Sequence, residues 1–458
     1  MKKNIIDKHN QSPVIIIAGG GWSGLATAVK LISEGYKVRL IEASPDLGGR
    51  ARTVTTNNMQ LDNGQHILLG AYANTLKLTK LLNLNESDLF SRKSLDLKIQ
   101  DKHNCFHIKA ASLPNPLHML SALMFAKGIS VKEKILISQC WLFMLAKRFK
   151  IKQDISVLNY LKQHKQTNNL IKFFWEPLCI GALNTQTNKA SIQVFLAVLK
   201  YSFTQKSSHS DILLPKKCLD DLLPAPAKEF INNNGGQVST GVRLLEIQTN
   251  NQMIHNIKTS ENHLQCEHLV LATPYQQTLK LLSAIPEQST LVSKLQKLNA
   301  EPISTLYLQY PETVAINNDM IGLVDTMTQW LIDRKSCGQP GLIAAVISAS
   351  GTHSDMDKQT LTKMIISEIK TLFPDWPEPI STKLIREKHA TFSCHTEINH
   401  LRPISGNIGQ NIWLAGDYTD TGLPATIEGA VSSGLECASK LIDTIKLNQG
   451  INHASLPG

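Results

Sequence analysis

Short, uninterrupted apolar runs near the start of the chain are typical of parallel strands buried on both faces. Residues 14–18 (Val-Ile-Ile-Ile-Ala) form such a run, and a glycine-rich turn and a helical pattern over 23–34 follow it. After Gly35 a second strand is expected over 37–42. A strand, turn, helix and strand within about 30 residues make one βαβ unit, which predicts an α/β fold.

The middle of the chain, from 74 to 222, has a mainly helical and irregular pattern. Within it, one amphipathic helix is expected over 130–149 with Ser130 as its N-cap, and further helices over 158–183. Later apolar segments predict strands that rejoin the first domain (237–240 and 269–274) and strands of a second sheet (303–310 and 342–348).

The chain ends with a helix expected over 356–373, a buried strand at 412–416 and a last helix over 425–446. Because the first and last segments are expected to share one sheet, we predict a discontinuous first domain, a discontinuous α+β second domain and a flexible tail. The predicted ranges are 1–75, 225–290 and 405–447 for the first domain, 76–224 and 291–404 for the second, and 448–458 for the tail.

Composition is that of an ordinary globular protein, with 42% hydrophobic and 18% charged residues in 458. The formal charge of +10 comes from lysines that are scattered along the chain. No nucleic-acid-binding motif accompanies them. The charge therefore favours a solvated surface first and an affinity for anionic lipid or diphosphates second, and nucleic acid is not expected as a partner.

The eight cysteines are widely spaced and include no Cys-x-x-Cys pair. This pattern predicts neither a metal site nor a disulfide framework, and it favours a reducing cytosol. The longest apolar stretch, 135–146, is too short to span a bilayer, and the polar segment 1–10 is unlike a signal peptide.

Gly19, Gly21 and Gly24 have the spacing G-x-G-x-x-G between a predicted strand and a predicted helix. In a dinucleotide-binding turn the first glycine permits the tight turn, the second lets the backbone approach a pyrophosphate, and the third permits close helix–strand packing. Glu42 ends the next strand, where its carboxylate can accept hydrogen bonds from ribose hydroxyls. Together these residues predict a dinucleotide site rather than a simple glycine-rich turn.

The closing segment 412–430 combines a buried strand, an acidic loop and a helix. Asp417 lies just beyond the strand and can bind ribityl or pyrophosphate-side groups, and the helix N-terminus at 426–430 can direct its positive end at a flavin carbonyl. We expect the two ends of the chain to fold onto one long cofactor, a flavin dinucleotide rather than a nicotinamide. A helix with an Asp cap, packed on a strand, is the plainer alternative.

Two polar turns follow the βαβ unit. Segment 47–52 (Leu-Gly-Gly-Arg-Ala-Arg) places two arginines after two glycines, which suits a loop whose guanidinium groups reach phosphate or flavin oxygens. A turn with solvated arginines is an equal alternative. Segment 62–66 (Asp-Asn-Gly-Gln-His) follows, near the expected start of the flavin ring.

These motifs together resemble the FAD-dependent amine oxidase and phytoene desaturase superfamily, which shares a two-dinucleotide-binding-domain (Rossmann-like) fold for its FAD domain. Four further segments narrow the resemblance to the squalene-associated FAD-dependent enzymes, the hydroxysqualene dehydroxylases of bacterial hopanoid synthesis. They are 61–72 (LDNGQHILLGAY), 175–184 (WEPLCIGALN), 210–215 (SDILLP) and 416–430 (GDYTDTGLPATIEGA). In matching order, the resemblance runs from 14 to 442.

The resemblance implies that the cofactor is FAD and that the backbone of Val242 meets its adenine. No cysteine lies near Asp417 in the sequence, so the flavin is expected to be bound non-covalently. The residues expected to hold it are Gly19, Gly21, Trp22, Ser23, Gly24, Glu42, Gly49, Arg50, Val242, Gly416, Asp417, Ala425 and Thr426.

The implied reaction is the reductive removal of an allylic hydroxyl from hydroxysqualene, with hydride from flavin N5, to give squalene. The apolar helical segment 117–149 suits a C30 isoprenoid chain. It could also rest on the inner face of the cytoplasmic membrane, in contact with other squalene-pathway enzymes; an ordinary helical core is the alternative.

The reaction also needs an acid to protonate the leaving hydroxyl. Glu176 lies in an apolar segment, where burial would raise its pKa and keep it protonated. The alternative acids are His66, Asp420 and His395. The ring face of Trp175 or Tyr418 could stabilise a cation, although core packing is the plainer role.

Three other classes of function fit the same motifs: a carotenoid-type desaturase, a flavin amine oxidase and a non-catalytic FAD-binding scaffold. Product analysis with hydroxysqualene and phytoene separates the first from the main hypothesis. Peroxide release with amines identifies the second, and isoprenoid binding without turnover identifies the third.

Overall fold

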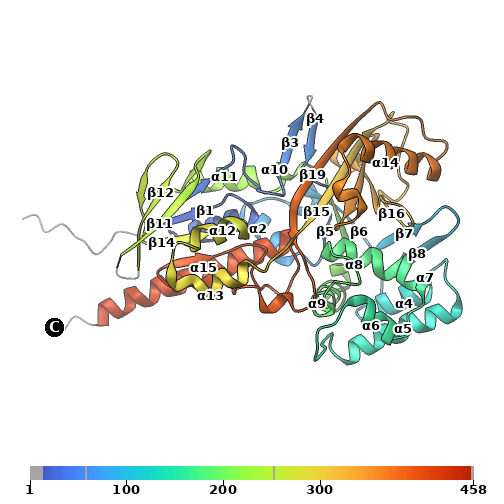
Figure 1. Cartoon of the computed structure of the whole chain (residues 1–458), viewed down its shortest axis with the longest axis horizontal. Coiled ribbons are helices and arrows are strands. Elements are labelled where there is room, and N and C mark those ends of the chain that lie inside the picture. Colours follow the sequence, from blue (N-terminus) through green and yellow to red (C-terminus); the bar gives the residue numbers. More distant parts are fainter. Residues whose placement is uncertain (1–13, 57–58, 251–252, 455–458) are drawn as a thin grey trace, which may run out of the picture.

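The computed structural model describes residues 14–56, 59–250 and 253–454 (Figure 1). Residues 1–13, which belong to the predicted first domain, and residues 455–458 of the predicted tail lie outside the described residues. The chain has a mixed α/β architecture in which two large sheets and a helical region lie side by side. The predicted α/β class is confirmed, while the exact domain ranges stay a prediction.

The first large sheet has six strands, which come from both ends of the chain and from its middle. Five neighbouring strands run parallel, and the short β20 pairs antiparallel at one edge. In sheet order they are β10 (Gln237–Thr240), β2 (Val38–Glu42), β1 (Ile15–Ala18), β14 (His268–Leu271), β21 (Ile412–Leu414) and β20 (Gly406–Asn407). The predicted return of the C-terminal strand to the first βαβ unit is confirmed.

Strand β1 is apolar throughout because both of its faces are covered. Ile15 and Ile17 join one buried cluster, whereas Ile16 and Ala18 join another. Among the helices that contribute to the first cluster are α1 (Trp22–Ser33), α11 (Pro224–Asn233) and α15 (Ile427–Ala454). Gly434 lets α15 approach α1 closely, since a Cβ at this position would collide with the carbonyl oxygen of Ser23.

The opposite face of the sheet is covered by a small antiparallel sheet and two helices, whose apolar side chains share the second cluster with Ile16. These elements are β11 (Leu244–Asn250), β12 (Met253–Thr259), β13 (His263–Gln265), α12 (Tyr275–Leu282) and α13 (Ser289–Leu295). The first sheet is therefore the central layer of a three-layer unit.

The second large sheet has seven strands and is antiparallel except for the parallel pair β16 and β7. In order they are β19 (Ser381–Phe392), β15 (Ala300–Gln309), β18 (Leu342–Ser348), β17 (Trp330–Asp333), β16 (Met320–Leu323), β7 (Asp96–Gln100) and β8 (Cys105–Lys109). Helix α14 (Lys358–Leu372) packs Leu361, Ile365 and Ile369 against one face of this sheet.

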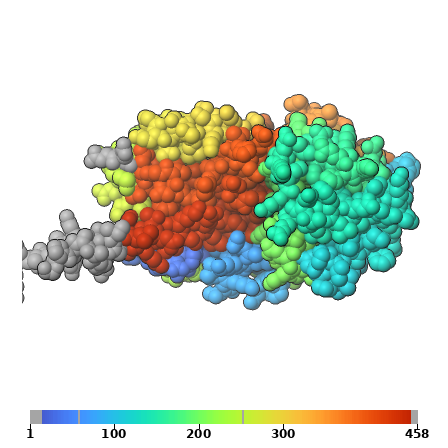
Figure 2. Space-filling view, turned by 90° about the horizontal axis from the view of Figure 1, so that it is seen from below, coloured from blue at the N-terminus to red at the C-terminus, as the bar shows by residue number. Residues whose placement is uncertain are grey.

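A helical region lies against the second sheet and forms one end of the molecule, in teal to green in Figure 2. Its helices are α4 (Leu117–Met124), α5 (Val131–Ala146), α6 (Val157–Gln163), α7 (Asn168–Leu170), α8 (Glu176–Leu183) and α9 (Ile192–Phe203), with a π-helical turn at Ile171–Trp175. Ser130 caps α5 in a capping box with Glu133, as the sequence predicts.

Short elements connect these layers. A hairpin of β3 (Thr53–Thr56) and β4 (Met59–Asp62) follows the βαβ unit, and a three-stranded sheet has the order β5 (Leu68–Leu69), β9 (Ile212–Pro215), β6 (Phe90–Lys93). The remaining helices are α2 (Ala73–Leu81), α3 (Glu86–Leu89) and α10 (Leu219–Leu222).

Two parts of the chain differ in detail from the prediction. Segment 74–222 is mainly helical, as predicted, but it also contains four short strands, because β7 and β9 pair with partners that are distant in the chain and leave little local signal. Helix α15 runs to Ala454, so residues 448–454 of the predicted flexible tail are helical. No proline interrupts 447–454, and the helix continues past its last buried apolar residue, Ile445.

Candidate flavin and substrate site

A cavity of about 920 Å³ is lined by residues of both large sheets and of the helical region. One part of its wall comes from the carboxyl ends of β1, β2 and β14, where ligands bind in open α/β sheets. Another part is apolar and comes from α8, α9 and the second sheet. Twelve of the thirteen predicted cofactor residues line this one cavity; the exception is Gly24.

The glycine turn between β1 and α1 fits a pyrophosphate. A Cβ on Gly21 would meet nothing nearer than the Cα of Gly49 at 4.0 Å, so this glycine leaves space on the cavity side. Helix α1 begins without a side-chain cap, and the buried Ser23 Oγ has no hydrogen-bond partner among the described residues. Unsatisfied donors at a helix N-terminus favour an anion.

Gly24 acts through packing. A Cβ on this residue would collide with the carbonyl oxygen of Gly19, at the point where α1 crosses the turn. This is the helix–strand contact expected of the third glycine of the motif.

Glu42 is held in a fixed orientation at the end of β2. Its Oε2 accepts from the Gly20 N–H at 2.6 Å, and its Oε1 accepts from the Ser44 N–H at 2.7 Å. Each carboxylate oxygen keeps a further lone pair for a ribose hydroxyl. The adjacent Val242 donates its N–H to the Glu42 carbonyl at 2.8 Å, so a contact between the Val242 backbone and adenine would use its carbonyl.

Arg50 and Asp417 join the two ends of the chain inside the cavity. Arg50 donates from Nη2 to Asp417 Oδ1 at 2.6 Å and from Nη1 to the Ala390 carbonyl at 2.9 Å. Sequence reasoning expected each of them to face the cofactor separately. Their pairing means that a bound cofactor meets a neutralised pair and not two free charges.

The closing segment places the N-terminus of α15 at the cavity wall. Gly416, Ala425 and Thr426 line the cavity, and Gly416 donates its N–H to Ser433 Oγ at 2.9 Å. Thr426 Oγ1 accepts from the Gly429 N–H at 3.0 Å, which fixes the first turn of the helix. The positive end of α15 is therefore available to a flavin carbonyl, as predicted.

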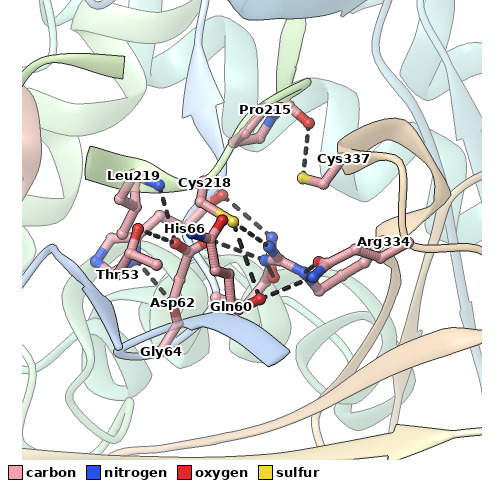
Figure 3. A network of polar contacts seen from close by, with 12 residues as sticks. Thr53, Gln60, Asp62, Gly64, His66, Pro215, Cys218, Leu219, Arg334 and Cys337 are labelled. Atoms are coloured by element: carbon pink, nitrogen blue, oxygen red, sulfur yellow. Dashed lines mark hydrogen bonds and ion pairs between the residues drawn. The ribbon is translucent and has the colours of Figure 1, made fainter. Parts of the chain in front are cut away.

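The polar turn at 62–66 is anchored by a buried ion pair (Figure 3). Arg334 Nη1 donates to Asp62 Oδ2 at 2.9 Å and to Gln65 Oε1 at 2.7 Å. Tyr307 donates its hydroxyl to the Asp62 carbonyl at 3.0 Å. Since Tyr307 belongs to β15 and Arg334 directly follows β17, these bonds connect the hairpin of β3 and β4 to the second large sheet, beside the cavity-lining residues Gln65 and His66.

His66 is the one proposed acid that lines the cavity. Its Nδ1 lies 3.0 Å from the Gly64 carbonyl, which can only accept, so Nδ1 carries the proton. Burial lowers the pKa of His66, although Asp62 opposes this. In a neutral ring with the proton on Nδ1, the Nε2 atom is a hydrogen-bond acceptor. His66 can therefore orient a substrate hydroxyl by accepting a hydrogen bond from it, but it has no Nε2 proton with which to protonate that hydroxyl.

The other three acid candidates lie away from the cavity lining. Glu176 is half-buried at the start of α8, and burial raises its pKa as expected. Asp420 is exposed, 3.9 Å from Arg402 Nη1. The ring Nδ1 of His395 lies 2.8 Å from the Thr396 carbonyl.

The aromatic wall differs from the predicted one. Trp175 is buried and donates from Nε1 to Gln166 Oε1, and the hydroxyl of Tyr418 bonds Thr278 Oγ1, so both belong to the core. Of the two roles considered from sequence, the structure agrees with core packing and not with a cation-stabilising lining. The aromatic residues that line the cavity are Trp22, Tyr72, Tyr201 and Trp330.

Sequence reasoning missed three residues of this region. Arg334 and Tyr201 lie in segments whose pattern marks only a strand end and a helix, so no local signal distinguishes them. Glu428 does have a signal, because it is an acidic residue between apolar ones in the closing helix. It is fully buried there.

Within the described ranges, no group of three or more His, Cys, Asp or Glu side chains could hold a metal ion. No helix of the part of the chain that the structure describes is both long and apolar enough to cross a membrane.

Comparison with known proteins gives one family and a set of relatives. The family model described as "Flavin containing amine oxidoreductase" matches residues 22–442. The chain is 26% identical to a hydroxysqualene dehydroxylase of Zymomonas mobilis, over 92% of this chain and 97% of that protein. It is 24% identical to one of Rhodopseudomonas palustris, over 94% and 99%. A 15-cis-phytoene desaturase of Solanum lycopersicum is 23% identical, over 96% and 80%.

Solved structures share the fold at low sequence identity. An oxidoreductase from Methanosarcina mazei matches with a TM-score of 0.73 and 14% identity, over 92% of this chain and 99% of that chain. A cyclohexylamine oxidase from Brevibacterium oxydans matches with a TM-score of 0.69 and 13% identity, over 95% and 100%.

Proposed function

Since the chain belongs to the flavin containing amine oxidoreductase family and is an FAD-dependent oxidoreductase, we propose that it reduces hydroxysqualene to squalene. The supporting observation is one continuous cavity whose wall combines the dinucleotide turn with a long apolar surface. Relatives that match almost the whole chain carry the name of this activity.

The apolar part of the cavity suits an isoprenoid chain. Its lining residues belong to α8, α9 and the inner face of the second sheet, and include Leu178, Ile180, Val198, Met320, Trp330, Ile332, Val346 and Ile385. Such a wall excludes water and binds hydrocarbon without directional bonds. A substrate with a single hydroxyl would be oriented by the few polar groups in reach, among them His66 Nε2.

In this proposal FAD is held non-covalently by Gly19, Gly21, Trp22, Ser23, Glu42, Gly49, Arg50, Val242, Gly416, Asp417, Ala425 and Thr426, and Gly24 supports the turn. When bound, the flavin would supply a hydride, which carries the two electrons of the reaction. The protein binds the phosphates at the α1 N-terminus, orients the ring at the α15 N-terminus and keeps water from the reacting carbon.

A polyisoprenoid substrate dissolves in a membrane, and one surface of the protein suits contact with it. Eight exposed apolar side chains of the α4–α5 surface lie within a 31-residue stretch: Leu113, Leu117, Met124, Phe125, Val131, Ile135, Leu142 and Phe143. The segment from 102 to 152 has nine basic residues and one acidic residue, Glu133. We propose that this surface binds the anionic face of a bilayer, from which the substrate enters.

The test uses FAD-loaded protein, reduced under anaerobic conditions and incubated with hydroxysqualene. Squalene is the expected product, and the absence of squalene would contradict the proposal. The second candidate is a carotenoid-type desaturase, which the similarity to phytoene desaturases favours. Oxidised protein with phytoene distinguishes the two, because a desaturase gives a product with more double bonds, whereas a dehydroxylase leaves phytoene unchanged.

A further inference from the structure

Glu428 is a buried carboxyl group with an unusual set of partners in the first turn of α15. Its Oε2 accepts from the N–H and the Oγ1 of Thr75, at 2.9 and 2.7 Å. Its Oε1 lies 2.9 Å from the Asn74 N–H and 2.7 Å from the Tyr201 hydroxyl. No ion pair among the described residues includes Glu428.

Tyr201 connects this carboxyl group to the cavity. The phenol belongs to α9, and it lines the cavity together with Tyr72, Thr426 and Ala430, whereas Glu428 lies behind the wall. A carboxyl group that is shut off from solvent can therefore exchange a proton with the cavity through the phenol oxygen.

We propose that Tyr201 is the catalytic acid that protonates the leaving hydroxyl and that Glu428 is the positioning residue that resupplies its proton. This inference rests on the proposed function, because it assigns an acid to that reaction. It replaces the four acids considered from sequence, of which only His66 reaches the cavity.

The relay balances atoms and charge. The Tyr201 Oη–H proton moves to the hydroxyl oxygen of the substrate, the C–O bond breaks, and water leaves with the electron pair of that bond. The carbon receives a hydride from reduced flavin, the reductant named above. Glu428 transfers its proton to the Tyr201 oxygen and is left as a carboxylate, which the N–H groups of Asn74 and Thr75 stabilise.

The protonation states agree with this geometry. Burial raises the pKa of Glu428, although its hydrogen bonds oppose the shift, and the relay requires the carboxyl group to hold a proton. Burial is the largest cause that raises the pKa of Tyr201 and of Tyr72, the two titratable groups that face Glu428, and both phenols stay protonated. With a proton on Oε1, Glu428 donates to Tyr201, and the phenol is free to donate into the cavity.

The first test compares Tyr201→Phe with wild-type protein, both FAD-loaded and reduced. Loss of a general acid should lower kcat by roughly 100-fold or more. The affinity of the oxidised protein for hydroxysqualene, measured from the shift of the flavin absorbance, should change by less than about 3-fold. Tyr160→Phe is the matched control, because this phenol lies in the same helical region outside the cavity lining. It should leave both quantities unchanged.

The second test does not depend on turnover. Infrared difference spectra between wild type and Glu428→Gln at neutral pH should contain the stretch of one protonated carboxyl group that the variant lacks. Tyr201→Phe should shift this band, since it removes one hydrogen-bond partner of Glu428. A wild type without the band would overturn the relay.

The outcomes separate the two hypotheses. If wild type forms squalene and Tyr201→Phe does so at the same rate, the relay is overturned and the proposed function stands. If wild type forms no squalene, the proposed function fails and the inference fails with it. Slow turnover with unchanged affinity and a shifted carboxyl band supports both.

Discussion

Arg334 and Asp62 form an ion pair at 2.9 Å in which neither side chain reaches solvent, their exposed fractions being 0% and 2%. The two residues are 272 positions apart, and the pair connects strand β4 to the segment that follows β17 in the second large sheet. Asp62 also accepts from the Leu219 N–H at 2.9 Å, and Arg334 also holds Gln65, so the pair fixes the turn that carries His66 (Figure 3).

Removing one partner of this pair should destabilise the protein strongly. Arg334→Met leaves a buried carboxylate without its cation, and such losses cost about 3–5 kcal/mol. Urea unfolding of the flavin-free protein measures the change. Lys335→Met is the control: this neighbouring cation is 43% exposed and lies near Asp319 and Asp333. Asp319 keeps Lys93 and Asp333 keeps backbone N–H donors, so the loss of Lys335 should cost about 0–1 kcal/mol. Equal costs for the two variants would contradict the buried-pair interpretation.

Substitution of two glycines of the same motif should affect two different properties, cofactor binding and stability. Gly21→Ala places a methyl group in free space on the cavity side, so the fold should survive while the pyrophosphate is excluded. Gly24→Ala drives a methyl group into the Gly19 carbonyl and should lower stability by roughly 1–3 kcal/mol. Flavin absorbance of the purified proteins, with thermal melting of the flavin-free forms, separates the effects. A yellow Gly21→Ala protein would contradict the assignment of the turn.

The parts of the fold that sequence predicts best are those whose signal is local. The run Ile15–Ala18, the helix that follows the glycine turn and the N-cap at Ser130 each depend on a few adjacent residues, and each is confirmed. The four strands between 90 and 215 were not predictable in the same way, because β7 and β9 acquire their conformation from partners far along the chain.

The candidate site follows the same rule. The glycines of the G-x-G-x-x-G motif were predictable from their spacing, and all of them but Gly24 line the cavity. The side chains that fix the site were not, since Arg334 and Tyr201 are recognisable only once the sheets and helices are assembled. The proposed reaction came from the resemblance to a known family, whereas three of the four catalytic acids considered from sequence lie away from the cavity lining.

The α4–α5 surface should bind anionic vesicles. Phe125 and Val131 are 80% and 73% exposed. Inserting both side chains into a bilayer should contribute about 3 kcal/mol to the free energy of binding. The double variant Phe125→Glu with Val131→Glu should therefore weaken vesicle binding by roughly 100-fold. Sedimentation with phosphatidylglycerol vesicles measures this. Ile380→Glu with Ile404→Glu is the matched control, since each is 70% exposed outside the α4–α5 surface. A similar loss in the control, or wild type that stays in solution, would contradict the prediction.

His118 should make stability depend on pH on the acid side of neutrality. The ring is buried on α4, neither of its nitrogens has a hydrogen-bond partner among the described residues, and burial lowers its pKa, with Asp211 opposing. Its stabilising contribution is present above the ordinary value of 6.5 and is lost as pH falls through the lowered folded-state pKa.

His118→Leu should therefore reduce the loss of unfolding free energy between about pH 7 and pH 5 by up to about 1.4 kcal/mol per pH unit, the contribution of one proton. It should also be neutral or stabilising at pH 7, because a buried polar group without a partner is removed.

Urea unfolding across this range is the measurement. Substitution of an exposed histidine, His103→Leu, is the control and should keep the wild-type slope. Four other histidines keep part of the slope in the variant, because their pKa values are also lowered mainly by burial: the buried His268 and His353 and the half-buried His66 and His164. An unchanged slope in His118→Leu would show that its ring is already protonated, or reaches water, in the folded protein.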